Sequence, residues 1–166
     1  MTHAILDDHL LRDLLADDTG PDLQNLLSTH QPATTNLYHF RLCRSVVSAR
    51  GGRLTGNWSA ERRQTLGRSL VNLPQELLVV PMCSLTFRMA QLAMDHRISS
   101  LGAEAVAAAE TLGGPLCVWT GDDGPGIRTC AEANGVPYRT ATHSPWAGAP
   151  SWRREWWRRE WDSNPR

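Results

Sequence analysis

The sequence has no net charge and no hydrophobic run of membrane-spanning length. Its 166 residues include 17 basic and 17 acidic side chains, which excludes the strongly basic surface typical of many nucleic-acid-binding proteins. An RNA enzyme that uses a metal and a local patch remains compatible with a neutral chain. A membrane helix needs about 20 consecutive apolar residues, and the N-terminus lacks the pattern of a secretory signal. These absences predict a cytoplasmic protein. A length of 166 residues predicts one main domain.

Common metal and nucleotide motifs are also missing. The four cysteines (Cys43, Cys83, Cys117 and Cys130) lie far apart without a C-x-x-C pair, and the six histidines include no H-E-x-x-H. We therefore expect reduced core cysteines and no zinc site. The loop GDDGPG matches neither G-x-G-x-x-G nor G-x-x-x-x-G-K-[ST], which argues against a nucleotide-binding fold.

The most informative stretch runs from Arg97 to Asp123. Its segment LGAEAVAAAETL has helical spacing and is ended by two glycines, and the apolar LCVW that follows is typical of a buried parallel strand. Helical segments and short apolar strands alternate along the rest of the chain in the same way. This order predicts an α/β fold, a three-layer α/β/α sandwich with a mostly parallel sheet of four or five strands. The predicted strands are 4–6, 32–35, 77–81, 116–119 and 138–140. The predicted helices are 9–16, 22–29, 36–49, 59–73, 84–97, 101–112 and 124–134, and we expect Ser59 and Ser84 to cap the helices that they begin.

Acidic pairs directly follow two of these strands. Asp7 and Asp8 come after the first strand, and Asp122 and Asp123 come after the fourth. Ligands of parallel sheets bind at the carboxyl ends of the strands. Glu104 shares the core-facing side of its helix, where a carboxylate needs a partner. We expect Asp7, Glu104 and Asp122 to converge, and like charges held so close usually require a divalent cation.

The same acids also have a structural interpretation. Either acid of each pair can cap the helix that follows, a contribution of about 1 kcal/mol. Glu104 can complete a weak capping box with Ser99 or Ser100. The sequence alone leaves both interpretations open.

Four segments together resemble the PIN domain, the nuclease fold of many toxin and antitoxin systems. They are ILDDHLLRDLLA, the helix LGAEAVAAAETLG, the strand closing in WTGDD, and GVPYR. The resemblance implies an α/β/α sandwich whose acids hold Mg²⁺ or Mn²⁺ for cleaving RNA. On this resemblance Asp7 matches the first acid, Glu104 replaces the aspartate that opens the late helix, and Asp122 matches the acid two residues after Thr120. These three acids are therefore the expected metal ligands and catalytic residues.

The resemblance also implies a function and partners. The expected function is a PIN-like metal-dependent endoribonuclease, the toxin of a toxin–antitoxin pair, in which water attacks an RNA phosphodiester. The candidate partners are an RNA substrate, an antitoxin protein and a second copy of the chain in a homodimer. No membrane is expected among them.

One family acid has no counterpart here. PIN domains place a glutamate on the helix after the second strand, whereas the corresponding NLYHFRLCRSVV offers His39, Arg41 and Arg44 but no carboxylate. A cation near the site would compete with a metal. This departure supports an alternative function, that of a catalytically impaired PIN-like module that binds RNA or a protein partner.

The composition changes abruptly after the last predicted strand. The PIN-like domain is expected to span residues 1–141, and residues 142–166 form a tail with five of the seven tryptophans and a near-duplicated WRREW. Such basic and aromatic interleaving could bind single-stranded nucleic acid by stacking. The favoured interpretation is a poorly ordered extension without core contacts.

Overall fold

The computed structural model describes residues 2–48 and 52–142, so the predicted tail lies, apart from Thr142, outside the described residues. The strands are β1 (Thr2–Leu6), β2 (His30–Thr35), β3 (Leu78–Val80), β4 (Leu116–Trp119) and β5 (Tyr138–Ala141). The α-helices are α1 (Asp8–Leu15), α2 (Pro21–Thr29), α3 (Asn36–Val47), α4 (Gly52–Thr55), α5 (Ala60–Val71), α6 (Thr86–His96), α7 (Ser100–Leu112) and α8 (Pro125–Ala133). Two short 3₁₀ helices, η1 (Met82–Ser84) and η2 (Thr120–Asp122), follow β3 and β4. None of the helices in these ranges is long and apolar enough to cross a membrane.

The five strands form one parallel sheet in the order β3-β2-β1-β4-β5, which confirms the predicted fold class. β1 lies at the centre, with β2 on one side and β4 on the other. Its register with β4 places Ile5 opposite Leu116 and Leu6 opposite Cys117. All five strands therefore end at the same edge of the sheet, where the segments after β1 and β4 are neighbours.

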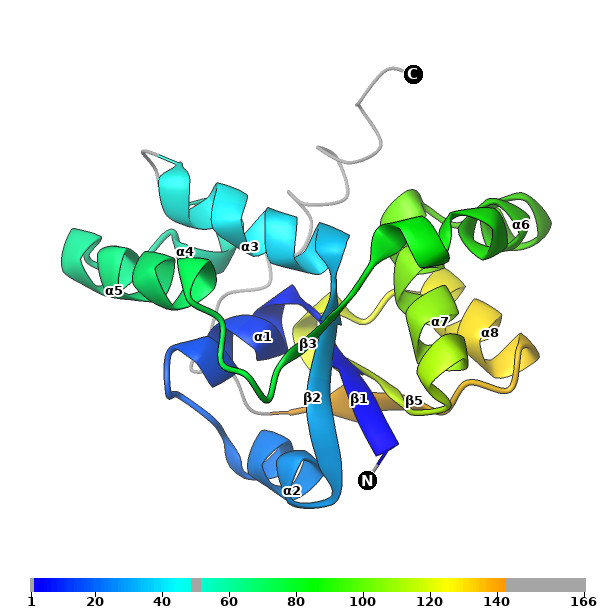
Figure 1. Cartoon of the computed structure of the whole chain (residues 1–166), viewed down its shortest axis with the longest axis horizontal. Coiled ribbons are helices and arrows are strands. Elements are labelled where there is room, and N and C mark those ends of the chain that lie inside the picture. The colour runs from blue at the N-terminus through cyan, green and yellow to red at the C-terminus, as the bar shows by residue number, and fades with distance from the viewer. Residues whose placement is uncertain (1, 49–51, 143–166) are drawn as a thin grey trace.

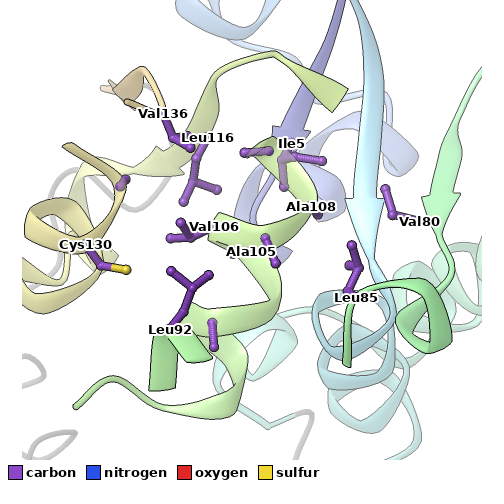
Figure 2. Close-up of a cluster of buried hydrophobic side chains, with 14 of the residues drawn as sticks. Ile5, Val80, Leu85, Leu92, Ala105, Val106, Ala108, Leu116, Cys130 and Val136 are labelled. Atoms are coloured by element: carbon purple, nitrogen blue, oxygen red, sulfur yellow. The ribbon is translucent and has the colours of Figure 1, made fainter. Parts of the chain in front are cut away.

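Helices cover both faces of the sheet (Figure 1). Along β1 the side chains alternate, so Ile5 packs on the side of α6, α7 and α8 while Ala4 and Leu6 pack on the side of α1 and α2. α7 contributes five alanines and one valine to the first of these cores, and these small side chains let the helix lie close to the strands (Figure 2). A third cluster joins α1 to α3, α4 and α5 around Leu11, Leu42 and Leu66.

Side-chain caps fix where several helices begin. Asp7, Thr35, Ser59 and Ser99 accept backbone N–H groups at the starts of α1, α3, α5 and α7, and the cap at Ser59 confirms its sequence-based prediction. The predicted cap at Ser84 is wrong. Ser84 ends η1, and its hydroxyl donates to the Pro81 carbonyl at 2.7 Å.

The acids after β4 do not cap α8. The residue before that helix is Gly124, which has no side chain to accept a bond. Asp123 instead pairs with Arg128 at 2.5 Å and accepts the Tyr138 hydroxyl at 2.9 Å, which joins the start of α8 to β5.

The cysteines are free, and their burial differs. Cys117 and Cys130 are buried as predicted, Cys43 is half-buried, and Cys83 is exposed, so the core prediction is wrong for Cys83. Burial raises the pKa of Cys117 to about 12, which makes it a poor nucleophile at neutral pH.

Gly114, between α7 and β4, is the tightest backbone approach among the described glycines. A Cβ atom at this position would lie 1.8 Å from the carbonyl oxygen of His3, a backbone atom of β1 that cannot move aside without disturbing the central strand. The absence of a side chain at Gly114 is therefore required for β4 to pair with β1.

We predict that Gly114→Ala lowers the free energy of unfolding by about 3 kcal/mol, the upper part of the usual range for overpacking, because the obstructing atom is backbone. Gly126→Ala is the matched control, since its Cβ would meet only Ile98 at an ordinary 3.7 Å. Urea unfolding of both variants checks this. Equal midpoints for the two would contradict the predicted clash.

Candidate functional site

The candidate site lies where β1 and β4 end. Asp7, Asp8 and His9 directly follow β1, while Asp122 ends η2 after β4. Within the described ranges, one carboxylate oxygen of Asp8, one of Asp122 and one ring nitrogen of His9 all lie within 4.8 Å of one another. The pairing of the two strands therefore brings side chains more than 110 positions apart into one cluster, which we call the edge cluster (Asp8, His9 and Asp122).

Asp7 holds this edge together. Its Oδ1 accepts the Leu10 amide at 2.8 Å and so caps α1, while its Oδ2 accepts the Trp119 amide of β4 at 2.7 Å. The side chain is almost fully buried. One carboxylate thus ties the start of α1 to the end of β4, and the capping interpretation of Asp7 is correct.

Negative charge accumulates beside Asp7. Burial raises its pKa well above the usual range, the nearby Asp8 and Asp122 carboxylates raise it further, and the two amide hydrogen bonds oppose the rise. Burial and the same three acids raise the pKa of the Tyr38 hydroxyl, which Arg41 opposes. The ring of Tyr38, on α3, therefore lies beside the acids.

Arg41 supplies a positive charge to this edge. Its Nε lies 3.1 Å from Oδ2 of Asp8, whose side chain is fully buried, whereas Arg41 is 21% exposed. Arg41 lies on α3, whose sequence contains no carboxylate. The sequence-based expectation of a cation near the site is thus realised as an ion pair.

From the sequence, Asp8 was named only as one of two acids after a strand, and His9 was not considered at all. His9 is buried, and its ring stacks on Trp119 with 4.5 Å between centroids and a 36° tilt. Trp119 in turn packs over Gly121, where a Cβ would lie 2.2 Å from the indole. The signal available in the sequence was the position of His9 directly after two acids at a strand end.

Glu104 is engaged elsewhere, at the start of α3. Its Oε2 accepts the Leu37 amide at 2.8 Å, and the residue is fully buried on α7. Burial raises its pKa, and hydrogen bonds from the Thr35 hydroxyl and from the amides of Leu37 and Asn36 oppose the rise. The weak capping box proposed at Ser99 is formed without it, because Ser99 itself accepts the Gly102 amide.

The structure thus brings Asp7 and Asp122 into electrostatic contact and adds Asp8 and His9 to them. Glu104 lies at the junction of β2 and α3. The assignment of Asp7, Glu104 and Asp122 as metal ligands stays a prediction from the resemblance.

No protein-family model matches the chain, and no curated protein matches it either. The geometry of the edge therefore carries the functional argument.

We predict that Arg41→Gln, measured in EDTA, lowers the free energy of unfolding by about 3 kcal/mol, since it leaves the buried Asp8 carboxylate without its ion pair. Asp18→Asn is the control. It breaks the solvent-exposed pair with Arg62, for which about 1 kcal/mol or less is expected, and leaves the Arg62 guanidinium over the ring of Trp58. Chemical unfolding at neutral pH compares the two, and a loss for Arg41→Gln no larger than the control would show that Asp8 does not depend on Arg41.

Proposed function

We propose that the protein is a PIN-like, divalent-metal-dependent endoribonuclease whose cation binds at the edge cluster. The observation that supports this most directly is the convergence of Asp8, His9 and Asp122 within 4.8 Å at the carboxyl edge of the sheet. Asp7 adds a third carboxylate beside them. These carboxylates disfavour one another's ionised forms, and a divalent cation bound among them would relieve that repulsion.

The donor set fits such an ion. Carboxylate oxygens suit Mg²⁺ and Mn²⁺, and the imidazole of His9 shifts the preference toward Mn²⁺. Asp8 and Asp122 would supply the oxygens and His9 the nitrogen. Asp122 is only half-buried, which leaves room on its side for water and a substrate.

The chain's own residues would hold this arrangement still. Asp7 fixes the separation between α1 and β4, and Trp119 keeps the His9 ring in place by stacking. A divalent cation bound there would stabilise charge on a phosphodiester and lower the pKa of a water molecule. RNA as substrate and the toxin role rest on the resemblance to PIN domains.

The Arg41–Asp8 ion pair favours a second candidate function. A guanidinium already neutralises Asp8, so the edge could be stable without a metal. The chain would then be a PIN-like module that binds RNA or a protein without cleaving RNA.

The two functions give opposite results in metal titrations. If the cation binds, the melting temperature should rise with Mn²⁺ by roughly 5–10 °C at a hundredfold excess over the dissociation constant. Asp122→Asn should abolish both this rise and the cleavage of single-stranded RNA. Asp95→Asn, which changes an exposed carboxylate on α6, should leave both unchanged.

Arg41→Glu sharpens the test. The new carboxylate would face the buried Asp8, so this variant should be less stable than the unmodified protein in EDTA and should gain more from Mn²⁺. The nuclease hypothesis would be excluded if Mn²⁺ changed the melting temperature of neither the unmodified protein nor Arg41→Glu and if the RNA stayed intact. The binding-module hypothesis would then remain.

A further inference from the structure

α3 begins without an acid of its own. Thr35 caps it by accepting the Tyr38 amide at a long 3.3 Å, and its first turn contains no acidic residue. By contrast, α1, α2 and α5 each carry Asp or Glu in the first turn. α6, α7 and α8, like α3, have none. A negative charge near a helix N-terminus is favourable, and at α3 it can come from another part of the chain.

Glu104 supplies it from α7. Its carboxylate accepts the Leu37 amide at 2.8 Å across 67 positions of sequence. The nearby Thr35 hydroxyl and Asn36 amide lower the pKa of this carboxyl and so favour its charged form. The arrangement has the chemistry of a capping box, with the acid contributed by a different helix.

The surroundings of Glu104 do not suit a magnesium or manganese ligand. Glu104 is completely inaccessible to solvent, as are its sequence neighbours Ala103, Ala105 and Val106. Mg²⁺ sites usually keep several waters, which are less readily placed at a side chain without solvent access. Among the described residues, the group whose donor atoms converge does not include Glu104.

We infer that Glu104 is a positioning residue, which anchors the N-terminus of α3 so that Arg41 reaches Asp8. Leu37 and Arg41 are four residues apart and lie on the same side of α3, one turn from each other. The point at which the helix is anchored therefore sets where the Arg41 guanidinium stands. The importance of that guanidinium for metal binding rests on the proposed function, whereas the anchoring of α3 does not.

The junction that Glu104 anchors extends to β3. The Asn36 side chain accepts the Met82 amide of η1 at 2.7 Å. Loss of the Glu104 carboxylate would thus loosen the segments after β2 and β3 together, on the same edge as the acids.

Three variants separate positioning from metal ligation. Glu104→Gln keeps a side-chain oxygen that can accept the Leu37 amide, Glu104→Ala removes it, and Asp122→Asn is the matched change of carboxylate to amide in the edge cluster. The readouts are Mn²⁺ affinity by calorimetry and hydrogen exchange of the Leu37 amide by NMR, measured without metal.

We expect Glu104→Ala to speed exchange at Leu37 by about tenfold or more, the loss of one hydrogen bond to a charged group. Glu104→Gln should restore most of the protection and bind Mn²⁺ nearly as well as the unmodified protein. Asp122→Asn should keep the Leu37 amide protected and lose Mn²⁺. Arg41→Gln should also cost less stability in the Glu104→Ala background than alone, because the ion pair is already misplaced there.

Two results would overturn the inference. If Glu104→Gln loses Mn²⁺ as fully as Asp122→Asn while Leu37 stays protected, Glu104 is a ligand. If Leu37 exchanges at the same rate in Glu104→Ala as in the unmodified protein, Glu104 does not anchor α3. Absence of Mn²⁺ binding in the unmodified protein would refute the proposed function, while the exchange of Leu37 would still decide the role of Glu104. Should Glu104→Ala fail to fold, Glu104→Met, which fills the same space without an oxygen, carries the exchange readout, and Glu104→Gln carries the Mn²⁺ readout.

Discussion

The acidic edge depends on one buried carboxylate, that of Asp7, which accepts an amide from α1 and an amide from β4. These two bonds fix the segments that carry Asp8, His9 and Asp122. The same bonds hold a carboxylate in a site where burial and two like charges disfavour its ionised form. The two hydrogen bonds that join α1 to β4 therefore also place the Asp7 carboxylate close to Asp8 and Asp122, where a positive charge is favourable.

The fold was predictable from the sequence because its signals are local. The run LCVW is a buried strand at the predicted residues, since four apolar residues between a glycine stop and a turn are too few for a helix and suit a strand covered on both faces. Ser59 predicted the start of α5 because a serine side chain can accept an amide of the first helical turn. The prediction at Ser84 was wrong because a serine hydroxyl can also donate to a nearby carbonyl in a tight 3₁₀ turn. Sequence spacing does not distinguish this bond from a helix cap.

The site was predictable only in part. Strand ends located Asp7 and Asp122, because parallel topology brings consecutive carboxyl ends to one edge. The partner of Glu104 could not be derived, since a carboxylate on the inner side of a helix contacts whatever the tertiary fold places there, here the start of α3. The Arg41–Asp8 contact could not be predicted for the same reason. The sequence suggested a cation near the site but not which acid it would neutralise.

The central position of β1 has a consequence for the order in which the protein can assemble. β1 is made first, yet its neighbour β4 follows more than 100 residues later, and the bond between Asp7 and Trp119 spans 112 positions. A growing chain on the ribosome therefore has no edge cluster until most of the domain has been synthesised, because contacts this distant in sequence close late. Asp8 and His9 are therefore made long before the Asp122 carboxylate that lies beside them, and the edge cluster belongs to the folded domain rather than to its N-terminal half.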